Sequence, residues 1–297
     1  MSWSIFQCQD PDFSVRSAPD NITFGVSRHA MQRSEVFRDM FSLCEQEPGN
    51  SPEAPDAEGP NVVDLHEPAD VLAILLRILH EPPKPPEEIV SDPPELDSYV
   101  KKYNEATVIP LPLLELVLLH LVDKYLLDES ITRVLEQHLL AHAASNGLRV
   151  YSFAVANGMS KVANKASHYV LPMAQYTLQD VRCIPTVKAY HDIVRLQDFR
   201  VQALRDLLLK EDIFPHGYGA CQPHAESTPT TWDTRRKALL ARIETGSDIA
   251  WEMSSLVETF RDCKTCQKAC IAAVDMLAYK CRRIPKTLEK LPSGYLE

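Results

Sequence analysis

The sequence predicts an α+β N-terminal domain followed by an all-α C-terminal region. Residues 13–26 alternate apolar and polar side chains with a period of two, which indicates half-buried strands. Later segments, most clearly residues 71–79, carry apolar side chains at helical spacing. A chain of 297 residues has room for one to two domains, and its hydrophobic content of 45% is enough for a sizeable core.

The first predicted element is a β-hairpin. Apolar side chains alternate with polar ones in two short runs, which contain Phe13, Val15, Ile22, Phe24 and Val26. The sequence Pro19-Asp20-Asn21 separates the two runs, and these residue types favour a turn. We therefore expect the two strands to pair with each other.

An amphipathic helix is predicted after the hairpin. Four apolar side chains recur at i, i+1, i+4 and i+5 and share one helix face: Val36, Phe37, Met40 and Phe41. Ser34, with Glu35 behind it, suits an N-terminal cap. Arg38 and Asp39 point to solvent, so we expect the four apolar side chains to hold the helix to the core.

A strand and two further helices are predicted downstream. Residues 61–65 indicate a short strand, and Pro68 is tolerated in the first turn of the helix that follows. This helix carries an apolar stripe made of Val71, Leu72, Leu75, Leu76 and Leu79. Residues 113–127 are apolar nearly all round and predict a buried helix. They contain no run of 18 or more apolar residues, so we expect no membrane span there.

Residues 22–43 resemble the opening of a BTB/POZ domain, as fungal multi-domain proteins carry it. The resemblance rests on the sequence VFRDMF at residues 36–41, placed after a hairpin. In the family a histidine usually follows the strand valine, whereas here Val26 is followed by Ser27 and Arg28. The departure concerns polar positions, and the fold rests on the apolar ones.

The resemblance continues beyond this segment. Asp123-Lys124-Tyr125 matches a frequent Ala-Asp-Lys-Tyr sequence of the family, with Val122 in place of the alanine. Residues 148–170 resemble the helical pair that often follows the BTB core, and Gly158 suits the stop between its two helices. The resemblance implies three segments: a BTB/POZ-like domain over residues 10–130, a helical extension over 131–172 and a helical region over 173–297.

By this resemblance the chain is a non-enzymatic protein–protein interaction module. BTB/POZ domains do no chemistry; they form homo- or hetero-oligomers, and many are adaptors that recruit substrates to cullin-type ubiquitin ligases. A scaffold or transcriptional regulator without a ligase role is the alternative. The exposed residues of the signature segment are then the candidates for partner contact: Arg28, Arg38 and Asp39.

The composition excludes some classes of protein. A net charge of −10 argues against a nucleic-acid binder, which would show a basic face. The N-terminal residues carry no signal-peptide pattern, and eight cysteines without one suggest reduced thiols or metal ligands. We therefore expect an intracellular protein, cytoplasmic or nuclear, with protein partners and no nucleic-acid, membrane or small-molecule partner. Residues 45–60 and 81–94 are acidic and proline-rich, so they are predicted to be disordered loops.

The C-terminal region contains two pairs of potential metal ligands. Cys221 and His224 form a C-x2-H pair, and Cys263 and Cys266 form a C-x2-C pair. Two such pairs can surround a tetrahedral Zn²⁺, and four protein ligands leave no open position, so the predicted zinc is structural. Related fungal BTB proteins resemble this chain in carrying a tryptophan helix between such pairs, where Trp232 lies here.

Two alternatives to structural zinc stay open. Cys263, Cys266 and Cys270 would share one face of a continuous helix, and buried reduced cysteine also serves as a small apolar core residue. A metal-dependent enzyme using the same cluster would need an open coordination position. The sequence contains no G-x-S-x-G motif or phosphate-binding glycine loop to support other catalysis. His120, His138 and His142 lie on apolar helices and are predicted to be structural histidines of the core or its boundary.

Overall fold

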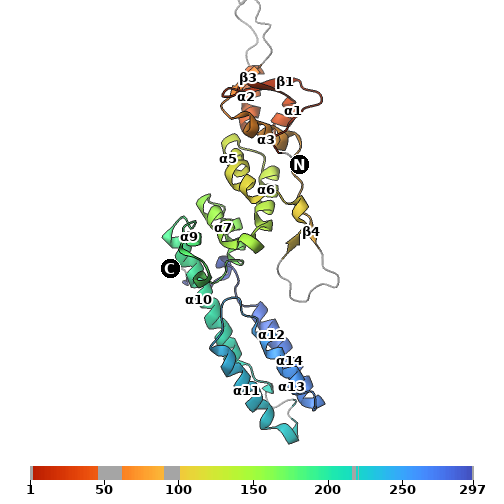
Figure 1. Cartoon of the computed structure of the whole chain (residues 1–297), viewed down its shortest axis with the longest axis vertical. Helices are drawn as coiled ribbons and strands as arrows, with labels where there is room; N and C mark the ends of the chain where they lie inside the picture. The colour runs from red at the N-terminus through yellow and green to blue at the C-terminus, as the bar shows by residue number, and fades with distance from the viewer. Residues whose placement is uncertain (1–2, 46–61, 90–100, 216–218, 220, 296–297) are drawn as a thin grey trace, which may run out of the picture. The chain divides into compact units, whose positions relative to one another are not determined.

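The structure is a mixed α+β protein in which helix greatly outweighs strand. It is a computed structural model, and it describes residues 3–45, 62–89, 101–215, 219 and 221–295 (Figure 1). The contacts between Cα atoms divide the chain into two units, residues 1–144 and 145–297. Among the described residues all strands belong to the first unit, which agrees with the predicted α+β class and the all-α C-terminal region.

The N-terminal unit begins with strands and ends with helices. Its elements, in chain order, are β1 (Phe13–Ser17), β2 (Ile22–Val26), α1 (Arg28–Met31), α2 (Glu35–Glu45), β3 (Val62–Leu65), α3 (Ala69–His80), β4 (Glu88–Ile89), β5 (Lys102–Tyr103), η1 (Glu105–Thr107), α4 (Leu111–Leu113), η2 (Leu114–Leu118), α5 (Leu119–Tyr125) and α6 (Glu129–Ala141).

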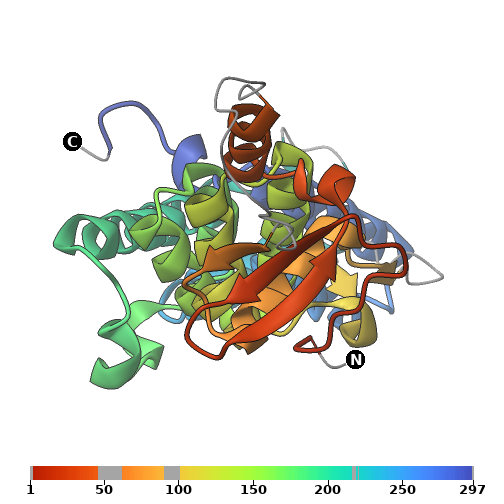
Figure 2. The ribbon, with the colours of Figure 1, turned by 90° about the horizontal axis from the view of Figure 1, so that it is seen from above.

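The predicted hairpin is confirmed, and β1 lies at the centre of a three-stranded sheet of order β2-β1-β3 (Figure 2). β1 and β2 pair antiparallel, with Phe13 opposite Val26. β3 pairs parallel to β1 and places Arg16 opposite Asp64. Their side chains form two hydrogen bonds of 2.6 and 2.8 Å, from Nε to Oδ1 and from Nη2 to Oδ2.

The helix predicted after the hairpin is α2, and Ser34 caps it as expected. The backbone N–H of Phe37 donates to Ser34 Oγ (3.3 Å), and this hydroxyl donates to the carbonyl oxygen of Tyr125 (2.5 Å). Phe37 is 1% exposed, and its ring stacks on that of Tyr125 with the centroids 5.4 Å apart. Phe41 is buried as well. The cap and the stacked pair therefore fix α2 against the end of α5.

The prediction that Val36 holds α2 to the core is wrong, because its side chain is 38% exposed. Met40 is only half-buried. The predicted face was too wide: on a helix these two residues lie about 100° to one side of Phe37 and Phe41. With the exposed Leu43 they make an apolar row at i, i+4 and i+7, which we call the α2 stripe.

The predicted helix that follows β3 is α3, and its apolar stripe is confirmed. It begins at Ala69 directly after Pro68, and its leucines are fully buried. Lys124 and Tyr125 contact the carboxylate of Glu67, which is buried just before this helix; the Tyr125 hydroxyl lies 3.1 Å from Glu67 Oε1. Residues of the Asp123-Lys124-Tyr125 sequence thus join the start of α3 to the end of α5.

The apolar segment predicted over residues 113–127 is helical, but it is not buried all round. It contains a π-helical turn, η2, between α4 and α5, and it ends at Leu126 in the left-handed conformation (φ 46°). Leu114 and Leu118 are fully buried, whereas Leu116 is 71% exposed. One side of this helix therefore faces away from the core of the unit.

The helical stretch Glu105–Tyr125 is long and apolar enough to cross a membrane by length and composition, with a mean hydropathy of 1.7. A core helix of a soluble protein passes the same test, and 44% of the tested window is buried. The sequence prediction used a stricter criterion, an unbroken apolar run. The absence of a membrane span stays a prediction.

The two proline-rich segments have different outcomes. Nearly all of residues 45–60 lie outside the described part of the chain. Residues 81–94 were predicted to be disordered, but their described part includes β4, which pairs antiparallel with β5. The buried His138 helps to order this segment, because its Nε2 lies 2.8 Å from the carbonyl oxygen of Lys84.

The C-terminal unit is helical throughout its regular elements. These are, in chain order, α7 (Ala143–Ala156), which begins two residues before the unit does, α8 (Ser160–Ser167), η3 (Met173–Gln175), α9 (Leu178–Val181), α10 (Val187–Lys210), η5 (Gln222–His224), α11 (Ser227–Leu240), α12 (Ile249–Ser254), α13 (Leu256–Thr259), α14 (Lys264–Arg282) and η6 (Leu288–Lys290). Gly158, in the left-handed region (φ 68°), lies between α7 and α8 as predicted.

The core of the C-terminal unit lies among α10, α11, α12 and α14 (Figure 1). Trp232 is 1% exposed, and its indole Nε1–H donates to the carbonyl oxygen of Glu211 (3.0 Å). Leu208, Met253 and Leu277 pack into the same cluster and are fully buried. This core fixes the positions from which α11 and α14 present the candidate site.

Candidate metal centre

The two predicted ligand pairs begin two helical elements of the C-terminal unit. Cys221 directly precedes η5, and its carbonyl oxygen accepts a hydrogen bond from the backbone N–H of His224 (3.1 Å). Cys263 directly precedes α14, and Cys266 lies in the first turn of that helix. Each pair is therefore held by a single tight turn, which places both of its side chains on one side of the backbone.

The structure brings all four side chains together. Their four potential ligand atoms lie within 4.8 Å of one another. Cys221 Sγ lies 3.6 Å from Cys263 Sγ and 3.5 Å from Cys266 Sγ. His224 Nδ1 lies 3.1 Å from Cys221 Sγ and 3.8 Å from Cys266 Sγ.

These separations fit a tetrahedral metal ion. Bond lengths of about 2.3 Å to sulfur and about 2.0–2.1 Å to nitrogen require roughly 3.8 Å between two sulfurs and roughly 3.6 Å between sulfur and nitrogen. Three of the four observed distances, 3.1–3.6 Å, are somewhat shorter than these values, and the fourth, 3.8 Å between His224 Nδ1 and Cys266 Sγ, is slightly longer. The cluster could therefore hold a metal ion with three sulfur ligands and one nitrogen ligand.

The electrostatics of the cluster favour one thiolate and resist more. The backbone N–H of Cys266, followed by the His224 side chain, lowers the pKa of Cys263 to about 6. Desolvation, followed by hydrogen bonds from Cys266 and Cys263, raises the pKa of Cys221 to about 11. The first thiolate forms easily at the start of α14, where the helix dipole also favours an anion. Several thiolates this close would repel one another, and a cation between them would offset that repulsion.

Thr228 is a site residue that the sequence analysis missed. It lies in α11, is 2% exposed, and its hydroxyl donates to Cys266 Sγ at 3.3 Å. Such a hydrogen bond from outside the ligand set orients a metal ligand. Thr228 is 38 residues from Cys266, and no sequence spacing indicates the contact.

A small cavity adjoins the cluster. It has a volume of about 260 Å³, and hydroxyl groups and one carboxylate contribute to its lining: Ser227, Thr228, Thr231, Thr259 and Asp262. His224, Cys263 and Cys266 also line it. The cluster is thus accessible from one side.

Two other cysteines of α14 fit the alternative role of a small apolar core residue. Cys270 is fully buried in the apolar core, and burial raises the pKa of its thiol to about 11. Cys281 packs against the same core. Helical spacing alone grouped Cys270 with Cys263 and Cys266, but only the latter two reach the cluster.

The other residues considered from the sequence have ordinary structural roles or exposed positions. His138 Nδ1 accepts a hydrogen bond from the backbone N–H of Ile109 (3.2 Å), and His142 Nε2 lies 2.8 Å from the Ile109 carbonyl oxygen, so both are structural as predicted. His120, predicted to belong with them, is exposed instead, because it lies on the outer side of α5. Arg38 and Asp39 are exposed. Arg28 is half-buried instead, and its guanidinium lies 4.9 Å from the ring centroid of Phe13.

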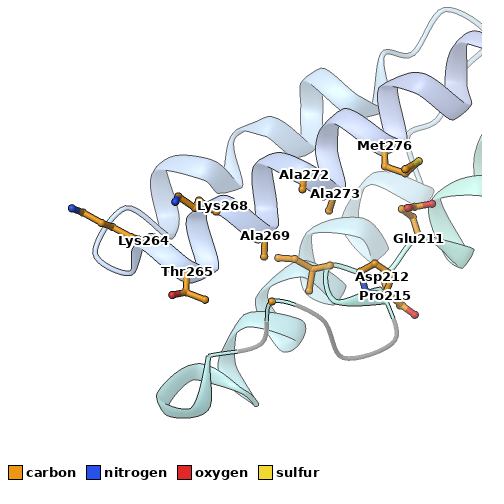
Figure 3. A pocket seen from close by; sticks show the side chains of 12 residues that line it. Glu211, Asp212, Pro215, Lys264, Thr265, Lys268, Ala269, Ala272, Ala273 and Met276 are labelled. Carbon is orange, nitrogen blue, oxygen red and sulfur yellow. The ribbon is translucent and has the colours of Figure 1, made fainter.

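A groove lies along a different face of α14 (Figure 3). It has a volume of about 550 Å³, and its apolar lining includes Ile213, Ala269, Ala273 and Met276. Lys264 and Lys268 lie towards one end, and Glu211 lies towards the other (Figure 3). We call this feature the α14 groove.

Comparison with known proteins does not place the chain in a family. It matches no protein-family model, no curated protein and no solved structure. Function is therefore inferred from the residues and geometry described above.

Proposed function

We propose that Cys221, His224, Cys263 and Cys266 bind one structural Zn²⁺. The observation that carries the proposal is the convergence of four protein ligand atoms, from two separate turns, to within 4.8 Å of one another. Three thiolates and one imidazole are the ligands of common structural zinc sites, and zinc is the usual ion for such a set. In this proposal zinc ties the start of α14 to the segment before α11.

The test is metal analysis of the purified full-length protein, with two variants of α14. We expect about one zinc per chain in the wild type and substantially less in Cys263→Ser. Cys270→Ser is the matched control, because Cys270 lies on the same helix but outside the cluster. It should keep its zinc. A wild-type protein without stoichiometric metal, or equal loss in both variants, would contradict the proposal.

We further propose that the whole chain is a non-enzymatic, intracellular protein–protein interaction module. In this proposal the four side chains of the cluster fill the coordination shell of the zinc ion. No coordination position is then open for a substrate or a catalytic water. Support for the interaction role comes from apolar surface at the α2 stripe and in the α14 groove. Exposed apolar surface of this kind commonly marks a site of protein association.

For the N-terminal unit we propose a BTB/POZ-like fold that mediates self-association or pairing with another protein. The supporting features are the β1–β2 hairpin, the VFRDMF helix packed on Tyr125, and the strand β3 followed by α3. The α2 stripe, with the neighbouring exposed residues Arg38 and Asp39, is the surface we assign to this contact.

Sedimentation of the full-length protein at micromolar concentration tests self-association. We expect an oligomer, and we expect Leu43→Glu in the α2 stripe to dissociate it. Leu116→Glu is the matched control, because Leu116 is an equally exposed leucine (71% against 67%) outside the stripe. A monomeric wild type would contradict self-association, and equal sensitivity to both substitutions would contradict the assignment to α2.

An adaptor role requires one surface for a ligase component and another for a substrate, and the two units each offer one. Pull-down from cells followed by identification of the bound proteins separates this role from its alternative. A cullin among the partners would support an adaptor of a ubiquitin ligase. Partners from transcription or a scaffold, without a cullin, would support the alternative role.

A metal-dependent enzyme remains the second candidate, and the polar cavity beside the cluster is the observation that favours it. Such an enzyme would exchange one protein ligand for water. Cobalt substitution distinguishes the cases, since Co²⁺ held by four protein ligands should not change its absorption spectrum when small anions are added. A spectrum that responds to azide would favour an open, catalytic position.

A further inference from the structure

The candidate metal centre brings together sulfur atoms from two separate turns. Cys221 Sγ, from the turn before η5, lies 3.6 Å from Cys263 Sγ and 3.5 Å from Cys266 Sγ, and the last two belong to the start of α14. A disulfide has an S–S distance of about 2.05 Å, so two of these sulfurs have to approach by only about 1.5 Å to form one. A covalent bond could therefore replace a metal ion as the link between the two turns.

The small polar cavity beside the cluster leads to one of these sulfurs. Cys263 lines this cavity of about 260 Å³ and is half-buried. Cys266 lines it too, but it is 1% exposed, and its sulfur accepts a hydrogen bond from the Thr228 hydroxyl. Other hydroxyl groups in the lining, those of Thr231 and Thr259, suit a small polar molecule. Cys263 is therefore the thiol that a small polar oxidant meets first.

We propose that Cys263 and Cys221 form a redox switch, in which hydrogen peroxide converts the two thiolates into a disulfide and the zinc ion leaves. This inference rests on the proposed zinc site and adds a form of regulation to it. Zinc itself has no redox chemistry, so the sulfurs are the groups that are oxidised. A thiol that coordinates a metal is already deprotonated, and the thiolate is the form of cysteine that reacts.

The reaction has two steps. The Cys263 thiolate attacks hydrogen peroxide; an S–O bond forms, the O–O bond breaks, and hydroxide leaves, so this sulfur loses two electrons and becomes a sulfenic acid. The Cys221 thiolate then attacks the same sulfur; the S–S bond forms, the S–O bond breaks, and a second hydroxide leaves. Two protons from the solvent convert both hydroxides into water. Peroxide is thus reduced to water while two thiolates are oxidised to one disulfide.

Oxidation removes two of the four ligands of the proposed zinc site. Cys266 and His224 remain, and two protein ligands are fewer than a structural zinc site has, so the ion leaves. The new disulfide joins residues 42 positions apart and takes over the link between the start of α14 and the segment before α11. A disulfide that closes a loop of this length restricts the unfolded chain. We therefore expect the C-terminal unit to lose its metal and stay folded.

The experiment treats the reduced, zinc-loaded full-length protein with hydrogen peroxide at pH 7. A chromogenic indicator measures released zinc, and mass spectrometry of peptides, after alkylation of the free thiols, identifies the disulfide. We expect the loss of about one zinc per chain together with a Cys221–Cys263 disulfide, both reversed by a dithiol reductant and Zn²⁺. The proposal is overturned if zinc stays bound while the exposed Cys183 is oxidised. Zinc released without this disulfide, or with loss of the helical circular dichroism, also overturns it.

Two variants assign the roles of the cysteines. Cys221→Ser lacks the second thiolate, so peroxide should leave Cys263 as a sulfenic acid, which dimedone labels, and form no disulfide. A disulfide at Cys263 in this variant would overturn the role of Cys221. Cys270→Ser is the matched control, because Cys270 lies on the same helix but in the apolar core. It should release zinc and form the disulfide as the wild type does.

The two proposals for this cluster fail in different ways. A purified protein that holds no zinc but still forms the Cys221–Cys263 disulfide would contradict the metal site and leave the reactive thiol pair. A zinc-loaded protein that resists peroxide would contradict the redox switch and leave the metal site.

Discussion

Replacement of Phe37 by alanine should destabilise the N-terminal unit without removing a contact surface. The side chain is 1% exposed, and its ring stacks on Tyr125. Truncation of such a buried phenylalanine costs about 3–5 kcal/mol through lost burial and the cavity that remains. The stacking of the two rings accounts for roughly 0.5–1.5 kcal/mol of interaction beyond area. In a unit of this size we expect the melting temperature to fall on the order of 10 °C.

The matched control is Val36→Ala, one residue earlier in the same helix. Because Val36 belongs to the α2 stripe, both variants are compared at a concentration below that at which the protein associates. Val36 is 38% exposed, so this substitution should change the free energy of unfolding by no more than about 0.5 kcal/mol. Chemical denaturation of the full-length protein, followed through hydrogen exchange in α2, measures both variants. Equal destabilisation by the two substitutions, or a Phe37→Ala protein as stable as the wild type, would refute the assignment of the buried face.

Two further predictions concern the pH dependence of stability and a turn. His80, His138 and His168 all have a pKa lowered chiefly by burial, that of His168 to about 4. The unfolded chain therefore binds protons more readily than the folded chain. The contribution of these histidines to the free energy of unfolding is present in full above about pH 6.5 and is lost as the pH falls below that value. Urea denaturation from pH 7.5 to 5 should show this decline, and a stability that does not change with pH would contradict it. Gly158→Ala should lower the free energy of unfolding by about 1–2 kcal/mol, because residue 158 has a φ of 68°, which an alanine adopts only with backbone strain. No heavy atom lies near the added Cβ, so a steric clash does not contribute. A melting temperature equal to that of the wild type would contradict this prediction.

Short-range patterns predicted the local elements of this chain well. Period-two alternation located β1 and β2, and the i, i+4 leucines located α3, because these patterns depend only on which side chains share a face. The x2 spacing of the Cys–His and Cys–Cys pairs located the candidate metal ligands for the same reason, since each pair is built by one turn. The number of residues between the two pairs did not predict that the pairs lie close together in space. Their proximity depends on the packing of α11 and α14.

Features that depend on tertiary contacts escaped the sequence analysis. The parallel pairing of β3 with β1 joins residues 48 positions apart, as in Arg16 and Asp64. The exposure of Val36 was missed because a four-residue apolar pattern does not say where its centre lies. The segment that contains β4 is ordered partly by the contact between His138 and Lys84, which are 54 residues apart in the sequence. The acidic, proline-rich composition of the segment does not indicate this contact.

The first turns of α14 serve two features at once. Cys266 belongs to the Cys221/His224/Cys263/Cys266 cluster, while Lys264, Thr265 and Lys268 line the α14 groove on another face. If the cluster binds Zn²⁺ as proposed, any loss of order in this turn on metal removal would remove one wall of the groove as well. Metal binding and groove occupancy are then thermodynamically linked, and linkage is reciprocal: a partner that binds the groove more tightly in the presence of zinc must raise the affinity for zinc by the same factor. The helix would thus let the cellular supply of metal influence an association at a surface that the metal does not touch.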